Sequence, residues 1–375
     1  MLLHRVKTLI VISFLLMSVT ISPALATEVV VLHSTPKATN WTDQLALGFS
    51  AQLGDAAQIS QVYLGSPTDD DDYYDARFNE LAAVWGEHSP AAVITDGELA
   101  FAFMRKYRED LFVEAPVIYC GMVRPEPEQL RQCGDCTGVP LRHGLEETIH
   151  LIFALRPETT TLVGIMDGSQ ESIGVRVGAE MMMESSMDRA QILFPGHEKG
   201  DNEGLSVELV KTVASSVPRS GAVLFLGFAA DNAGNPVDTA EIIRLIARRS
   251  VAPVFVLSDE FLPTDTPSGV LGGVVVQGQA QGREVARLFQ RIQSGEPVRE
   301  MLTESIPPQP VVDLTVLARF GLAEKALPAG TTPINTPMKP AGTEGLSSTG
   351  VVWIVAGLSV LLVLFLIFRR RKHVN

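Results

Sequence analysis

The sequence predicts an α/β protein with two doubly wound lobes and one C-terminal transmembrane helix. Across most of the chain, short apolar runs rich in β-branched residues alternate with amphipathic stretches. This alternation is typical of parallel sheets that helices cover on both faces. The length of 375 residues suits two domains of roughly 150 residues each. An uncharged apolar run near the C-terminus is long enough to cross a membrane.

Nine segments are predicted as strands, because most of them are short and nearly continuous apolar runs. They are residues 29–33, 58–64, 91–95, 116–120, 161–166, 191–194, 222–228, 254–257 and 270–276. This number of strands suits two sheets better than one.

The stretches between these runs have the 3.6-residue period of amphipathic helices. In three of them the apolar residues fall on one helical face. These sets are Tyr74, Phe78, Leu81 and Trp85; then Leu145, Ile149, Ile152 and Phe153; and then Val285, Leu288, Phe289 and Ile292. The acidic run Asp69–Asp72 directly precedes the first set, where it favours a helix start over a calcium loop.

The two ends of the chain predict export and membrane anchoring. Residues 1–26 combine a basic start, an apolar run and Ala24-Leu25-Ala26, which is typical of a cleaved signal peptide. An uncleaved N-terminal anchor is the alternative. Residues 350–368 predict a transmembrane helix, and the basic tail at 369–375 places that end in the cytoplasm. We therefore expect a single-pass protein of the cell membrane with a periplasmic or other extracytoplasmic ectodomain.

Charge and composition narrow the possible partners. Residues 27–350 hold 24 of the 30 Lys and Arg residues and all 43 Asp and Glu residues. So acidic a segment repels a phosphate backbone, and we expect no nucleic-acid partner. Residues 328–349, rich in Pro, Gly and Thr, predict an extended stalk between the folded part and the membrane.

The cysteines and the missing motifs argue against enzymatic activity. Cys133 and Cys136 have the C-x-x-C spacing of a structural disulfide or a redox dithiol, and export favours the disulfide. Cys120 then remains a buried thiol. We find no phosphate-binding loop, dinucleotide fingerprint, zinc-protease motif or nucleophile elbow. The histidines show no metal-ligand spacing, so we expect neither a metal nor a cofactor.

Polar residues end many of the predicted strands, where parallel sheets bind ligands. They are His33-Ser34, Asp96-Gly97-Glu98, Tyr119-Cys120-Gly121, Asp167-Gly168-Ser169, Asp231-Asn232 and Ser258-Asp259-Glu260. An Asp or Ser at such a place is also the ordinary N-cap of the following helix. Both interpretations stay open for each residue.

Several motifs resemble the ABC-transporter substrate-binding-protein-like family, as found in extracytoplasmic sensor domains. In residues 91–121, one strand ends at Asp96 and a later one ends at Cys120-Gly121. Further motifs follow the order of the family. They are Leu32-His33-Ser34, Trp41-Thr42-Asp43, Gly48, Thr137-Gly138-Val139, Leu155-Arg156-Pro157, Phe228 to Gly234, Pro253-Val254, Gly269 to Gly273 and Gln281-Gly282.

The resemblance implies a type I periplasmic binding protein, with two Rossmann-like lobes joined by three crossings. The crossings would lie near residues 122–124, 276–278 and 295–298. Lobe 1 would then comprise residues 27–122 with 277–296. Lobe 2 would comprise residues 123–276 with 297–327.

The resemblance also implies a receptor that closes on a small molecule and performs no chemistry. The implied ligand-binding residues are Ser34, Trp41, Asp96, Asp231 and Asp259, and we expect Trp41 and Asp231 to lie outside the lobe cores. An amino acid or another small organic molecule is the expected ligand. The expected partner is an ABC permease or a separate membrane sensor. The alternatives are a structural or assembly protein of the cell surface and a periplasmic thiol-redox enzyme.

Overall fold

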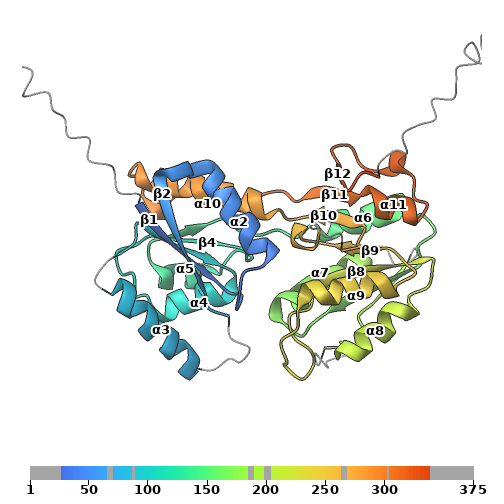
Figure 1. Ribbon diagram of the computed structural model, residues 1–375, viewed down its shortest axis with the longest axis horizontal. Helices are drawn as coiled ribbons and strands as arrows, with labels where there is room; N and C mark the ends of the chain where they lie inside the picture. The colour runs from blue at the N-terminus through green and yellow to red at the C-terminus, as the bar shows by residue number, and fades with distance from the viewer. Residues whose placement is uncertain are drawn as a thin grey trace, which may run out of the picture. The chain divides into compact units, whose positions relative to one another are not determined.

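The computed structural model describes residues 27–65, 71–86, 89–184, 190–197, 204–262, 268–301 and 304–337. These residues form two sheets, one in each of two α/β lobes (Figure 1). No helix within these ranges combines the length and the apolar character needed to cross a membrane. The predicted signal peptide, the predicted transmembrane helix and the basic tail lie outside the described residues.

The first lobe contains a five-stranded parallel sheet in the order β2-β1-β3-β4-β5. Its strands are β1 (Thr27–His33), β2 (Ala57–Tyr63), β3 (Ala92–Asp96), β4 (Val117–Cys120) and β5 (Cys136–Gly138). Its helices are α2 (Asn40–Leu53), α3 (Asp71–Trp85), α4 (Glu98–Tyr107), α5 (Pro127–Cys133) and α10 (Gly278–Gln293). Short 3-10 helices are η1 (Gly54–Ala56) and η3 (Val298–Glu300).

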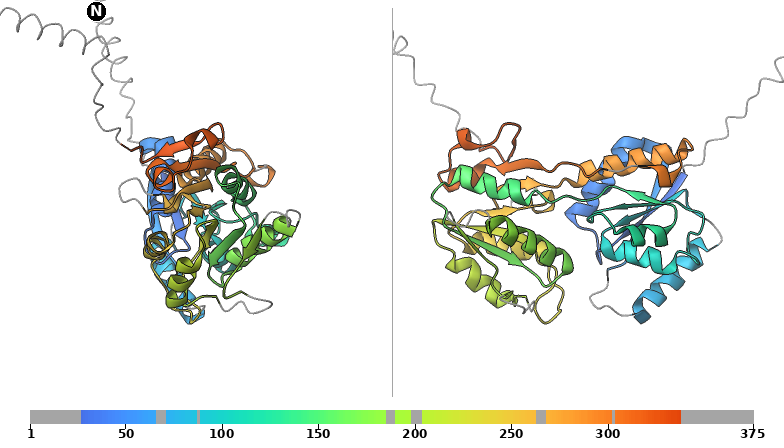
Figure 2. Two further views of the ribbon diagram at one scale, coloured as in Figure 1. Left: turned by 90° about the vertical axis from the view of Figure 1, so that its right-hand side faces the viewer. Right: turned by 180° about the vertical axis from the view of Figure 1, so that it is seen from behind.

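Alternating side chains of the first sheet build two cores. Val29 and Val31 pack with α2 and α10 on one face, while Val30 and Leu32 pack with α3, α4 and α5 on the other. Figures 1 and 2 show the two groups of helices on opposite faces of the sheet. Burial on both faces explains why the central strands β1, β3 and β4 are mostly apolar, whereas the edge strand β2 is only partly buried and contains polar residues.

The second lobe contains a seven-stranded sheet in the order β12-β11-β10-β9-β8-β6-β7. Only the pairing of β10 with β11 is antiparallel. The strands are β6 (Thr161–Met166), β7 (Gln191–Leu193), β8 (Gly221–Gly227), β9 (Val254–Val256), β10 (Gly272–Val275), β11 (Gln309–Asp313) and β12 (Thr332–Ile334). The helices are α6 (Leu145–Leu155), α7 (Gln170–Glu184), α8 (Val207–Ser216), α9 (Thr239–Arg249), α11 (Leu314–Arg319), η2 (Asp259–Phe261) and η4 (Glu324–Ala326).

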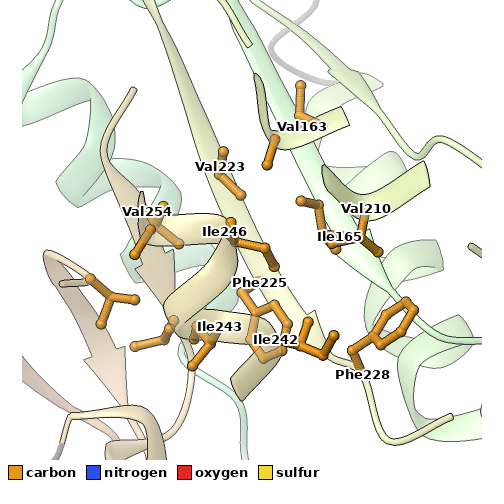
Figure 3. Packing of buried hydrophobic residues seen from close by; sticks show 14 of the residues in the cluster. Val163, Ile165, Val210, Val223, Phe225, Phe228, Ile242, Ile243, Ile246 and Val254 are labelled. Carbon is orange, nitrogen blue, oxygen red and sulfur yellow. The ribbon is translucent and has the colours of Figure 1, made fainter. Parts of the chain in front are cut away.

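On one face of the second sheet, α8 and α9 pack against the strands and form a hydrophobic core with them. In Figure 3, Ile242 and Ile246 of α9 lie beside Val223 and Phe225 of β8. A second cluster on the other face contains residues of α6 and α11. The second lobe is therefore also a three-layer α/β unit.

All nine predicted strands are present within a few residues of their expected bounds, and β5, β11 and β12 were not predicted. The stalk prediction is wrong for its first part, because Thr332–Ile334 pairs with β11. Two predicted crossings also lie too early. The chain leaves the first sheet after Gly138 rather than at 122–124, since β5 pairs with β4. It leaves again after Ile306 rather than at 295–298, because Met301 and Ile306 pack in the first lobe.

Helices α2 and α10 approach each other backbone to backbone. A Cβ atom added at Gly282 would overlap the carbonyl oxygen of Leu45, and one added at Gly48 would overlap that of Gln279. Only glycine leaves room for this approach. The close contact at these two glycines packs α10, which comes late in the sequence, against α2 in the N-terminal part of the same lobe.

Candidate functional site

A buried polar network lies at the carboxyl ends of β1 and β3. His33 Nδ1 lies 2.8 Å from Asp96 Oδ2, and Trp41 Nε1 donates a hydrogen bond of 2.9 Å to Asp96 Oδ1. The other ring nitrogen of His33 lies 3.2 Å from Gln61 Oε1, and the Tyr63 ring stacks on the imidazole. Asp96 is only 4% exposed. Both of its carboxylate oxygens therefore already have partners inside the first lobe.

The Trp41 ring lies where the chain crosses between the lobes. It forms a small apolar cluster with Leu141 and Val276, which belong to the first and second crossings. Trp41 is 9% exposed, so the expectation that it lies outside a core is wrong. Its indole is positioned to support the crossing segments, because one edge is tied to Asp96 and the ring packs on both segments.

Ser34 follows β1 and holds the start of α4. Its hydroxyl accepts a hydrogen bond of 3.0 Å from the Ala100 backbone N–H, and its own N–H donates to the Asp96 carbonyl. Gly97 stands at the N-cap of α4 with φ of 91°, a conformation that favours glycine. Ser34 thus caps the neighbouring helix from another strand, with its side chain half-buried.

Asp167 has the corresponding position in the second lobe, after β6. Its carboxylate accepts hydrogen bonds from the N–H of Ser169, the hydroxyl of Ser172 and the N–H of Ala229. Ala229 follows β8, so this carboxylate fastens two neighbouring strand ends to each other. The sequence named Asp167 as a strand-end residue without selecting it as a site residue.

Asp231 caps its own loop. Its carboxylate accepts hydrogen bonds from the side chain and backbone of Asn235 and from the N–H of Ala233. These bonds, above all the one from the Asn235 side chain, lower the pKa of Asp231. The carboxylate is therefore held as an anion in a partly exposed loop of the second lobe.

Asp259 joins the second lobe to the first. Its carboxylate accepts a hydrogen bond of 3.2 Å from the Gly278 N–H at the start of α10. The Asn40 side chain, at the start of α2, donates a hydrogen bond of 3.0 Å to the Glu260 carbonyl. Burial raises the pKa of Asp259 to about 6, and the Gly278 hydrogen bond opposes this shift.

The structure places the five residues predicted to bind ligand in three separate regions. Ser34, Trp41 and Asp96 belong to one network in the first lobe, and Asp259 lies at the junction with that lobe. Asp231 forms its side-chain hydrogen bonds within its own loop. Sequence reasoning named His33 only as a strand-end residue and did not name Asn40, and the partners of both are distant in the chain.

The described residues also contain an apolar pocket and the three cysteines. An apolar pocket lies beneath α2 in the first lobe, with His33 and Gln61 among its lining residues. Within the described ranges no three metal-ligating side chains come together. A disulfide joins Cys133 to Cys136, linking the end of α5 to the start of β5. Cys120 is buried, and burial raises the pKa of its thiol.

Known structures share this architecture. No family model and no curated protein matches the chain. The ABC domain from Streptococcus pneumonia in complex with L-Trp matches with a TM-score of 0.59 and 16% identity, over 83% of this chain and all of its own. A conserved domain protein from Vibrio cholerae matches with a TM-score of 0.58 and 13% identity, over 82% of this chain and 99% of its own.

The ligand-free, open structure of a substrate-binding protein with adhesive properties from Clostridium difficile also matches. Its TM-score is 0.54 at 13% identity, over 83% of this chain and 99% of the other. The chain has the type I periplasmic binding protein fold. The resemblance inferred from the sequence is thus confirmed at the level of the fold. None of these three proteins is described as an enzyme.

Proposed function

We propose that this protein is a membrane-anchored extracytoplasmic solute-binding receptor that closes on a small molecule. One observation carries the proposal. Both lobes together match a structure that holds L-Trp and another that is ligand-free and open. An amino acid or a similar small organic molecule is accordingly the proposed ligand class. The proposed partner is an ABC permease or a separate membrane sensor, which would respond to the difference between open and closed lobes.

The proposed contacts with ligand are Ser34, Asp231 and Asp259. Each lies directly after or near a strand end and keeps part of its side chain accessible. Trp41 and Asp96, in contrast, are proposed to support this surface from beneath, since they are buried and bonded to each other. A carboxylate at positions 231 and 259 suits the ammonium group of an amino acid.

A thermal-shift screen of the full-length protein in detergent tests this function. The screen covers amino acids, purines, polyamines and small organic acids, and a ligand at 100 times its Kd adds about 2.7 kcal/mol of stability. Asp231→Ala should weaken binding of the ligand found by about 1–3 kcal/mol, because an ammonium would lose its partner. Glu109→Gln, an exposed residue after α4, is the control and should bind normally. If no compound raises the melting temperature, the assembly-protein alternative is favoured.

A separate prediction concerns the membrane topology of the protein. We expect residues 27–350 outside the cytoplasmic membrane and residues 369–375 inside, because of Ala24-Leu25-Ala26 and the Arg369–Lys372 cluster. Protease added to intact spheroplasts should digest the ectodomain. Complete protection until detergent is added would contradict this topology.

A further inference from the structure

Strand β2 forms one end of the first sheet and, among the described residues, pairs only with β1. The Leu64 N–H, directly after β2, donates to the His33 carbonyl at the end of β1. The backbone groups of successive residues point to opposite sides of a strand. The N–H and C=O groups of Ile59 and Gln61 therefore face away from β1, where no described residue bonds to them. This side of β2 is an open edge for another strand.

The other three sheet ends are poorer templates for pairing. β5, β7 and β12 have three residues each, against seven in β2. A disulfide joins the start of β5 to α5, and β12 contains Pro333. Natural edge strands are usually protected by shortness, by charge or by proline. β2 has none of these protections, since its sequence is Ala-Gln-Ile-Ser-Gln-Val-Tyr.

Two contacts define which part of β2 is open. Arg77 of α3 donates a hydrogen bond of 2.9 Å to the Tyr63 carbonyl, so the C-terminal end of the edge is already occupied. The apolar pocket beneath α2 lies beside the remaining part. Ile59 and Gln61 line this pocket together with Leu45, Ala46 and Phe49 of α2. A strand added at the edge would thus find both backbone partners and apolar surface.

We propose that β2 is a dimerisation edge, at which a second copy of this chain adds its own β2 in antiparallel orientation. The symmetric register that pairs all seven residues places Ser60 on the two-fold axis, opposite Ser60 of the second copy. Ile59 then lies opposite Gln61 of the second copy, and the two exchange backbone hydrogen bonds. Ile59 of the second copy likewise lies beside Gln61 and the pocket, where its burial adds to the backbone bonds.

Charge favours this pairing of identical strands. The chain has a net charge of −13, so two copies repel each other at long range. β2 itself contains no charged residue. The Glu28 carboxylate on neighbouring β1 accepts hydrogen bonds from the side chains of Ser60 and Trp85. Pairing along β2 therefore places no like charges directly opposite each other.

Cross-linking of the full-length protein in detergent tests the pairing and its register. Ser60→Cys should form an intermolecular disulfide under mild oxidation, because residues in such a non-hydrogen-bonded pair have Cα atoms about 4.5 Å apart, within disulfide range. Gln58→Cys is the matched control at an exposed position of the same strand. It lies opposite Val62 of the second copy and should not link to itself. Cys120 is buried and Cys133 is bonded to Cys136, so the introduced thiol is the one that reacts.

Sedimentation equilibrium measures the same dimer without a cross-link. Gln61→Lys places a charge at the open edge and should weaken dimerisation by about ten-fold or more. Gln293→Lys makes the same change at an exposed position of α10 and should dimerise like the wild type. Because Gln61→Lys also removes a partner of His33, a circular-dichroism melt confirms its fold. The Ser60→Cys experiment does not depend on this variant.

Several outcomes would overturn the proposal. One is a monomeric wild type, and another is equal cross-linking of Ser60→Cys and Gln58→Cys. A folded Gln61→Lys variant that dimerises like the wild type would place the interface on another surface. Mass spectrometry of the cross-linked peptide identifies the occupant of the edge. A partner other than β2 of a second copy, such as another protein or residues 1–26, would assign the edge to a different occupant.

Discussion

Gly282→Ala is expected to lower the free energy of unfolding by about 3 kcal/mol, which is the scale of forced overpacking in a tight core. The new methyl group would overlap the Leu45 carbonyl oxygen and press on the Phe49 backbone nitrogen. Neither is the flexible end of a side chain, so α2 and α10 must separate. Their separation would also disturb the core in which Val31 of β1 and Val285 of α10 pack together.

Gly174→Ala is the matched control for this prediction. Gly174 lies within α7, and a Cβ atom added there meets nothing within 4 Å. Because alanine favours a helix over glycine by roughly 1 kcal/mol, this variant should unfold at the same or a higher temperature than the wild type. Thermal melts followed by far-ultraviolet circular dichroism compare the two. Equal melting temperatures for both variants would show that α2 and α10 are not in backbone contact.

The strands that the sequence predicted are those whose own residues favour them. Val29–Leu32 is an uninterrupted β-branched and aliphatic run, and both of its faces are buried. β5 (Cys-Thr-Gly) and β12 (Thr-Pro-Ile) lack the apolar runs of the predicted strands, so their pairing with a neighbouring strand stabilises them more than their composition does. β11 contains Pro310, and a proline argues against a strand when the sequence alone is considered.

In the candidate site, the partners of individual side chains could likewise not be predicted from the local sequence. The sequence correctly placed Asp96 at a strand end, but its partner Trp41 lies 55 positions away. No local pattern reveals that the indole would turn toward that carboxylate rather than toward a ligand. Asp231 is different, because Asp-Asn-Ala-Gly-Asn is a local turn signal. The sequence-based interpretations were a ligand contact or the N-cap of the following helix, and that N-cap is Asp238 instead.

Trp41→Ala is expected to lower the free energy of unfolding by about 3–5 kcal/mol, the usual cost of removing a buried aromatic side chain. The substitution empties the space between Leu141 and Val276 and leaves Asp96 Oδ1 without its indole donor. Trp41→Phe is the graded control, since it keeps most of the ring and loses only the Nε1 hydrogen bond. Its loss should be nearer to 1–2 kcal/mol.

Urea unfolding of both variants, followed by circular dichroism, measures these losses directly. The sequence-based hypothesis, in which Trp41 contacts the ligand and lies outside the lobe cores, makes a different prediction. It expects Trp41→Ala to keep a cooperative unfolding transition and to weaken ligand binding by about 1–3 kcal/mol. The burial of the ring and its bond to Asp96 favour a large stability loss instead. A wild-type unfolding midpoint for Trp41→Ala would therefore favour a direct ligand contact for this side chain. It would contradict the inference that the indole stabilises the crossing segments around Leu141 and Val276.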